Sequence, residues 1–124
     1  MDAAGVTRWL AGYEAAWRSP GTDQLSGLFT PDATYSAHPY AQPLTGLAAI
    51  ARMWEAERDG PGEVFAMTSQ IVAVAGDVAV LRVEVGYGEP VTQEYRDLWV
   101  IAFAPDGRCA AFEEWPFAPP AAAR

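Results

Sequence analysis

The chain has 124 residues, the size of one ordinary domain, and this length is enough to bury a core without disulfides or metal ions. Hydrophobic residues make up 51% of the sequence, which excludes disorder for most of the chain. The formal net charge of −8 repels phosphate backbones and anionic lipids, so we expect neither a nucleic-acid nor a membrane partner.

The sequence also indicates in which cellular compartment the protein is expected. No run approaches the ~20 apolar residues of a membrane span, and the N-terminus lacks the basic and apolar regions of a signal peptide. We therefore expect a cytoplasmic protein. The single cysteine, Cys109, cannot form an internal disulfide, and we expect it to be a small core residue.

Three helices are expected in the first half of the chain. Asp2 is a good N-cap for the first, whose apolar residues recur every three or four positions until Ser19, Pro20 and Gly21 end it. Thr22 can cap a short second helix, and a third runs from Leu47 to about Arg58.

A short strand over residues 33–37 precedes an irregular loop that contains Pro39 and Pro43. This loop carries His38, the only histidine of the chain. Loops held by a rigid scaffold often carry chemistry, so His38 is a candidate acid or base; the alternatives are a hydrogen bond that orders the loop or an exposed ring. A lone histidine without spaced cysteines or carboxylates is a poor zinc or iron site, and we expect no metal and no cofactor.

From Val64 onward, β-branched and aromatic residues dominate, and turn signals recur after each long run. This pattern predicts a four-stranded antiparallel meander over residues 64–75, 78–87, 92–103 and 108–115.

Helices followed by long strands predict an α+β domain of residues 1–117, with a flexible tail over residues 118–124. Long strands coil, so we expect a strongly curved, mainly antiparallel sheet with the three helices packed on its concave face. Such a cone encloses a pocket, and the many aromatic residues predict an apolar or aromatic ligand.

Asp97 is the most informative residue of the predicted third long strand. Side chains alternate along a strand, so Asp97 shares one face with Tyr95 and Trp99. Because burying an unpaired carboxylate costs several kcal/mol or raises its pKa, Asp97 marks either a structural network or a site.

A second carboxylate on the last strand could join Asp97. If the turn at residues 105–107 has three residues, Glu113 points the same way; if it has four, Phe112 and Glu114 do. Two inward carboxylates would separate their pKa values and leave one protonated as an acid.

Two segments carry a resemblance to a known family. They are FTPDATYSAHPYAQPLTG at residues 29–46 and YRDLWVIAFAPDGRCAAFEEWPF at residues 95–117, with a helix between them. The order of these segments resembles that of the nuclear transport factor 2-like superfamily, in particular its SnoaL-like branch. The resemblance favours the four-residue turn, with Glu114 on the same face as Asp97. The resemblance implies a cone-shaped fold shared with ketosteroid isomerases and polyketide cyclases, and a homodimer through the outer sheet face.

The resemblance to ketosteroid isomerases also implies roles for single residues. Tyr13 falls at the oxyanion-hole tyrosine of the first helix, whereas the two tyrosines that network with it fall on Phe29 and Trp54. The proton-shuttling Asp maps near His38, and the protonated oxyanion-hole Asp falls on Trp99. Steroid isomerisation is therefore not implied.

We expect a small lyase-, cyclase- or isomerase-like enzyme that performs cofactor-free acid–base chemistry on an apolar or aromatic carbonyl compound. His38 or Asp97 would remove a proton, and Tyr13 would stabilise the developing enolate. The alternative is a non-catalytic module that binds a hydrophobic ligand or a partner chain. The expected ligand contacts are Trp17, Tyr35, Trp54, Phe65, Trp99, Phe112 and Glu114.

Overall fold

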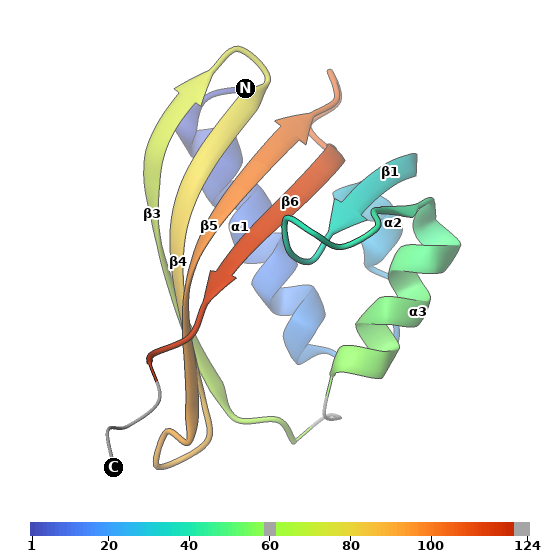
Figure 1. Ribbon diagram of the computed structural model, residues 1–124. Coiled ribbons are helices and arrows are strands. Elements are labelled where there is room, and N and C mark those ends of the chain that lie inside the picture. Colours follow the sequence, from blue (N-terminus) through green and yellow to red (C-terminus); the bar gives the residue numbers. More distant parts are fainter. Residues whose placement is uncertain (59–61, 121–124) are drawn as a thin grey trace.

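The computed structural model describes residues 1–58 and 62–120, and the structural statements below concern these residues (Figure 1). Three helices and a six-stranded sheet make up the fold. The helices are α1 (Ala3–Arg18), α2 (Leu25–Leu28) and α3 (Leu47–Glu57). The strands are β1 (Phe29–Ser36), β2 (Leu44–Thr45), β3 (Phe65–Ala75), β4 (Val78–Tyr87), β5 (Gln93–Phe103) and β6 (Cys109–Phe117).

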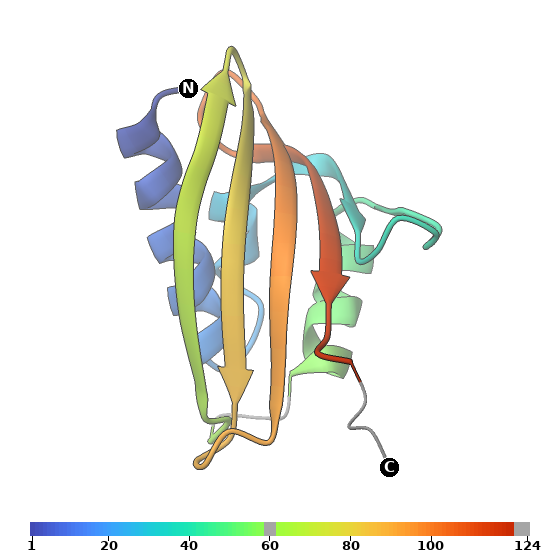
Figure 2. The ribbon, with the colours of Figure 1, turned by 60° about the vertical axis from the view of Figure 1, so that its left-hand side comes forward.

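The strands lie in the order β2-β1-β6-β5-β4-β3. All neighbours pair antiparallel except β1 and β6, which run parallel. The long strands bend along their length, and Figure 2 shows the sheet from its outer face with the helices behind it. The predicted α+β architecture, with a curved and mainly antiparallel sheet, is confirmed.

The predicted meander corresponds to β3 to β6, whereas the edge of the sheet beyond β6 was only partly predicted. β1 begins at Phe29, four positions before the predicted strand, and pairs with Leu44 and Thr45 of β2. No strand was predicted at β2, because two residues are too few to show an alternating pattern.

Helix α1 forms where the sequence provides a cap and an apolar stripe. Asp2 accepts a hydrogen bond from the amide of Gly5 at 2.8 Å, as predicted for an N-cap. At the other end, the Arg58 guanidinium donates to the carbonyl oxygens of Ala16 and Ser19. This contact joins the ends of α1 and α3, while the buried stripe of α1 faces the sheet.

Aromatic side chains fill the space between α1 and the sheet. Trp54 of α3 is fully buried and meets the Tyr13 ring edge-on, with 5.0 Å between centroids. Phe112 of β6 is 2% exposed and stacks on both Tyr13 and Tyr35. These rings fix the position of both tyrosines.

β6 continues to Phe117, and residues 118–120 have no regular structure, while the rest of the predicted tail, residues 121–124, lies outside the described residues. The segment expected to end α3 falls partly on residues 59–61, which are also outside them. None of the helices in the described ranges is long and apolar enough to cross a membrane.

Candidate functional site

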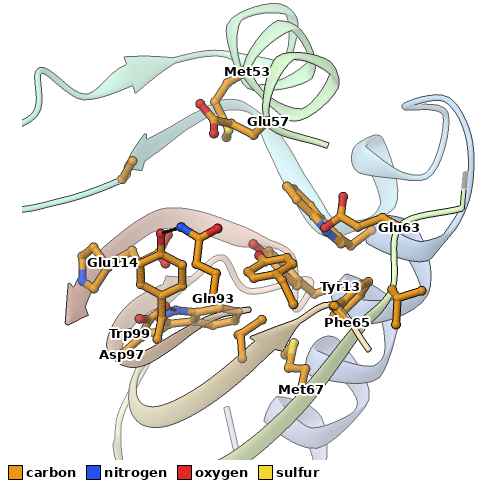
Figure 3. Close-up of a pocket in the computed structure, with 18 of the residues that line it drawn as sticks. Tyr13, Met53, Glu57, Glu63, Phe65, Met67, Gln93, Asp97, Trp99 and Glu114 are labelled. Carbon is orange, nitrogen blue, oxygen red and sulfur yellow. Dashed lines mark hydrogen bonds between the residues drawn. The ribbon is translucent and has the colours of Figure 1, made fainter. Parts of the chain in front are cut away.

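A cavity of about 640 Å³ lies between the concave face of the sheet and the helices α1 and α3 (Figure 3). Tyr13, Tyr35 and Asp97 are buried and form its floor, whereas Glu57 and Gln93 are exposed and form part of its rim. The volume is that of a pocket for a small organic molecule.

Asp97 is one of two buried polar or charged residues in the described chain, and it is 5% exposed. The indole N–H of Trp99 donates to Oδ2 of Asp97 at 3.2 Å. The other oxygen, Oδ1, is buried and receives no hydrogen bond from a described donor. A buried carboxylate oxygen of this kind requires a proton or a ligand to satisfy it.

Glu114 lies beside Asp97. On the β5–β6 ladder, Trp99 pairs with Glu114 and Asp97 with Pro116, so the two acids are diagonal neighbours on the concave face. Glu113 points outward and accepts a hydrogen bond from the Trp115 indole at 2.7 Å. Of the two registers open to the sequence, the structure has the one that turns Glu114 inward.

The environment of Glu114 favours its neutral form. Burial, followed by a hydrogen bond with Asp97 and the charges of Asp97 and Glu57, raises the pKa of Glu114 to about 9. Glu114 is therefore protonated at neutral pH, and its O–H is the group that can donate to the Asp97 carboxylate. The two side chains form an acid and a base at one place in the pocket.

Tyr13 and Tyr35 provide a second polar group on the cavity floor. Their hydroxyl oxygens are 3.1 Å apart, and both side chains are buried. Burial raises the pKa of both phenols above their ordinary value, so both remain neutral hydrogen-bond donors. When one hydroxyl donates to the other, the second retains a proton for a ligand.

Most of the candidate residues from the sequence meet in this cavity. Besides Asp97, Glu114 and Tyr13, the lining includes Trp17, Tyr35, Phe65 and Trp99. Trp54 and Phe112 do not line it, because both are fully packed within the core behind Tyr13. The two act as supports for the floor.

His38 lies outside the pocket, and the expected His38–Asp97 couple is not formed. The side chain of His38 is exposed on the loop after β1 and is not part of the cavity lining. Its carbonyl oxygen accepts hydrogen bonds from Ser36 Oγ and the amide of Ala41, which fixes a tight turn at the strand end. Glu114 takes the place beside Asp97 that His38 was expected to occupy.

Tyr13 has a tyrosine partner, although not at either position implied by the resemblance. The sequence positions expected for the partners of Tyr13 hold Phe29 and Trp54, but the hydroxyl of Tyr13 meets Tyr35 instead. Tyr35 reaches it because β1 pairs in parallel with β6 and places Tyr35 opposite Phe112. Only the strand order, which the sequence did not reveal, brings the two hydroxyls together.

Several lining residues were not predicted from the sequence. Met53 and Glu57 stand four positions apart on α3 and share one helix face, so their spacing could have indicated them. Glu63 accepts a hydrogen bond from the Trp17 indole at 3.3 Å. Tyr87, the last residue of β4, and Tyr95, near the start of β5, also line the cavity.

Acidic side chains gather in the pocket, but they do not form a metal site. Within residues 1–58 and 62–120, no three His, Cys, Asp or Glu side chains are grouped closely enough to hold a metal ion. Cys109 is buried in the core, where burial raises the pKa of its thiol to about 12.

Comparisons with known proteins agree with this architecture. The model of a family described as the SnoaL-like domain matches residues 6–112. No curated protein matches the sequence.

Solved structures with the same fold cover most of the chain. A candidate polyketide cyclase from Sinorhizobium meliloti is 26% identical, with a TM-score of 0.67 over 86% of this chain and 93% of that one. A candidate ketosteroid isomerase from Kribbella flavida is 16% identical, with a TM-score of 0.69 over 98% and 82%. An NTF2-like protein of unknown function from Silicibacter pomeroyi is 20% identical, with a TM-score of 0.60 over 92% and 94%. The predicted nuclear transport factor 2-like fold is thus confirmed.

Proposed function

The chain belongs to the SnoaL-like domain family, and from this premise we propose that it is a small enzyme that performs acid–base chemistry, without a cofactor, on a carbonyl compound in the central pocket. The observation that carries the proposal is the pair formed by Asp97 and Glu114 on the cavity wall. Two structures with the same fold, described as a candidate polyketide cyclase and a candidate ketosteroid isomerase, agree with this class of chemistry.

In the proposed reaction, the Asp97 carboxylate removes a proton from a carbon next to the carbonyl group. Oδ1 of Asp97 is the oxygen with no donor among the described residues, so it is the one available as the base. The electron pair of the broken C–H bond moves to the carbonyl oxygen and forms an enolate. The proton can then return to another carbon, which completes an isomerisation, or the enolate carbon can attack an electrophile.

The enolate oxygen requires hydrogen-bond donors in a dry environment. The Tyr13–Tyr35 pair supplies one from the floor, and the protonated Glu114 supplies another from β6. Both types of donor are neutral, so they stabilise negative charge as it develops on the substrate rather than attracting an anion beforehand. A hydrogen bond of this kind contributes about 100- to 1,000-fold in rate when it forms to the oxyanion.

Deuterium exchange tests this function without knowledge of the natural substrate. The protein is incubated in D₂O with a panel of aromatic ketones and β-diketones, and uptake at the carbon next to the carbonyl is followed by mass spectrometry. We expect wild-type protein to accelerate uptake and Asp97→Asn to reduce the acceleration by at least about 100-fold. Glu113→Gln is the control, because Glu113 faces away from the pocket. Full activity in Asp97→Asn would overturn the proposal.

A binding module is the second candidate, and the aromatic lining favours it. Seven of the residues around the cavity are aromatic, so a hydrophobic molecule would be held there without any reaction. A ligand that binds stoichiometrically but shows no exchange, in any member of the ketone panel, would support this second candidate.

A further inference from the structure

The charged groups around the pocket all have the same sign. Four carboxyl side chains line it, Glu57, Glu63, Asp97 and Glu114, and since Glu114 keeps its proton, it adds no negative charge to the others. None of the described lining residues is lysine, arginine or histidine. A cleft with low-dielectric walls concentrates such a one-sided field, which attracts cations and repels anions.

Two arginines lie behind the walls of the cavity, but each is engaged elsewhere. Arg18 pairs with Glu14 at 2.9 Å, and its guanidinium lies over the Phe65 ring, 3.8 Å from the centroid. Arg58 pairs with Glu55 and donates to the carbonyl oxygens of Ser19 and Gly21, which follow α1. Neither side chain lines the pocket, and their ion pairs are made with Glu14 and Glu55 rather than with Glu57 or Asp97.

Aromatic faces complete the surroundings that suit an organic cation. Trp17 and Phe65 lie on the α1–β3 side of the cavity, and Tyr87, Tyr95 and Trp99 lie on β4 and β5. The negative face of an aromatic ring attracts an ammonium group, and the interaction strengthens when water is excluded. Rings combined with carboxylates therefore distinguish a cation from a neutral molecule of the same shape.

Asp97 gives independent evidence that a ligand completes the site. Its side chain is 95% buried, being 5% exposed, and Oδ1 has no donor among the described residues. The cavity is the direction from which a donor can arrive, since Asp97 is part of its lining.

We propose that the pocket selects organic cations: its substrate carries a protonated amine or a quaternary ammonium group on an aromatic or apolar skeleton. The inference rests on the proposed function for the statement that the bound molecule is a substrate. The positive group lies toward Glu57 on α3, across the cavity from the sheet (Figure 3). The reacting end then lies against Asp97 and Glu114, which remain free for proton transfer.

The inference is tested with three probes of similar size and different charge. They are the phenethyltrimethylammonium ion, 2-phenylethanol and 3-phenylpropanoate, and binding at pH 7 is followed through the fluorescence of Trp17 and Trp99 and by calorimetry. We expect the cation to bind at least about tenfold more tightly than the alcohol, and the carboxylate to bind most weakly. Equal affinity for cation and alcohol, preference for the carboxylate, or no binding of any probe would overturn the inference.

Two variants distinguish the effect of the electric field inside the pocket on cation affinity from the effect of the net charge of the whole protein. Glu57→Gln should weaken the cation at least about threefold while the affinity for the alcohol stays unchanged. Glu84→Gln removes the same charge from the outer face of the sheet, where Glu84 lies beside Arg96, and should leave both affinities unchanged. If Glu84→Gln weakens the cation as much as Glu57→Gln does, the selectivity does not reside in the pocket.

This experiment and the deuterium experiment fail independently. Preference for the cation without any deuterium exchange would overturn the proposed function but not the selectivity of the pocket. Exchange of neutral ketones without preference for the cation would overturn the inference alone.

Discussion

Glu114 on β6 keeps its proton beside the Asp97 carboxylate on β5, and the two side chains share the concave face of the sheet. The paired strands place them close together, and burial prevents water from separating their charges. The pocket therefore offers a ligand an acid and a base side by side, together with two hydrogen-bonded tyrosines on its floor.

The protonated state of Glu114 predicts how stability depends on pH. Its pKa is raised from 4.5 to about 9 on folding, so the folded state binds more protons than the unfolded state between these values. The free energy of unfolding should therefore fall as pH rises from 5 to 9, because the folded state must either lose this proton or hold it against a rising pH. Urea unfolding at pH 5.5, 7 and 8.5 measures it.

Glu114→Gln should flatten that dependence, because the neutral amide loses nothing as pH rises. Glu113→Gln, on the neighbouring residue that faces outward, should follow the wild-type curve. Parallel curves for wild type and Glu114→Gln would mean that Glu114 is not held neutral.

Tyr35→Phe should reduce deuterium exchange by about tenfold or more and lower stability by only about 1 kcal/mol. The change removes the hydroxyl that lies 3.1 Å from that of Tyr13 but keeps the ring stacked on Phe112. Exchange rates and urea unfolding together separate the two effects. Tyr40→Phe is the matched control, since Tyr40 is 97% exposed and should change neither quantity.

His38→Ala should leave both exchange and stability close to wild type, within about 0.5 kcal/mol for the latter. The reason is that the His38 ring is exposed and its turn is held through the backbone carbonyl. A loss of exchange comparable to that of Asp97→Asn would show that the loop closes over the pocket and brings the imidazole to the substrate.

The outer face of the sheet is where we expect the homodimer contact. Leu98 and Trp115 are paired across β5 and β6 and are 37% and 39% exposed, and Phe117 is 56% exposed beside them. Arg96 and Glu84 border this patch with opposite charges, which suits a two-fold interface with a second copy. Light scattering should give the mass of a dimer for wild type and of a monomer for Trp115→Glu. A monomeric wild type would refute the expectation.

The sequence predicted those parts of the fold that depend on local pattern. Alternation along residues 92–103 placed Asp97 on the pocket face, and the Asp2 cap defined the start of α1. The parallel pairing of β1 with β6 depends on contacts between distant segments, and it is this pairing that moves Tyr35 to Tyr13. Local pattern carries no information on such pairing.

The errors at the site have the same origin. His38 was expected in the pocket because a loop between prolines has no pattern that fixes its direction, and the loop after β1 in fact holds it outside the cavity lining. Glu114 remained one of two choices until the register of the β5–β6 hairpin was known. Glu57 was missed although its spacing from Met53 placed both on one helix face.

The most direct test of the account is the titration of the Glu114 carboxyl carbon by ¹³C NMR, with its signal assigned by comparison with Glu114→Gln. The account predicts that the signal changes with a midpoint near pH 9, because burial and Asp97 hold the proton on Glu114. A midpoint near the ordinary value of 4.5 would contradict the acid–base pair on which the proposed function depends.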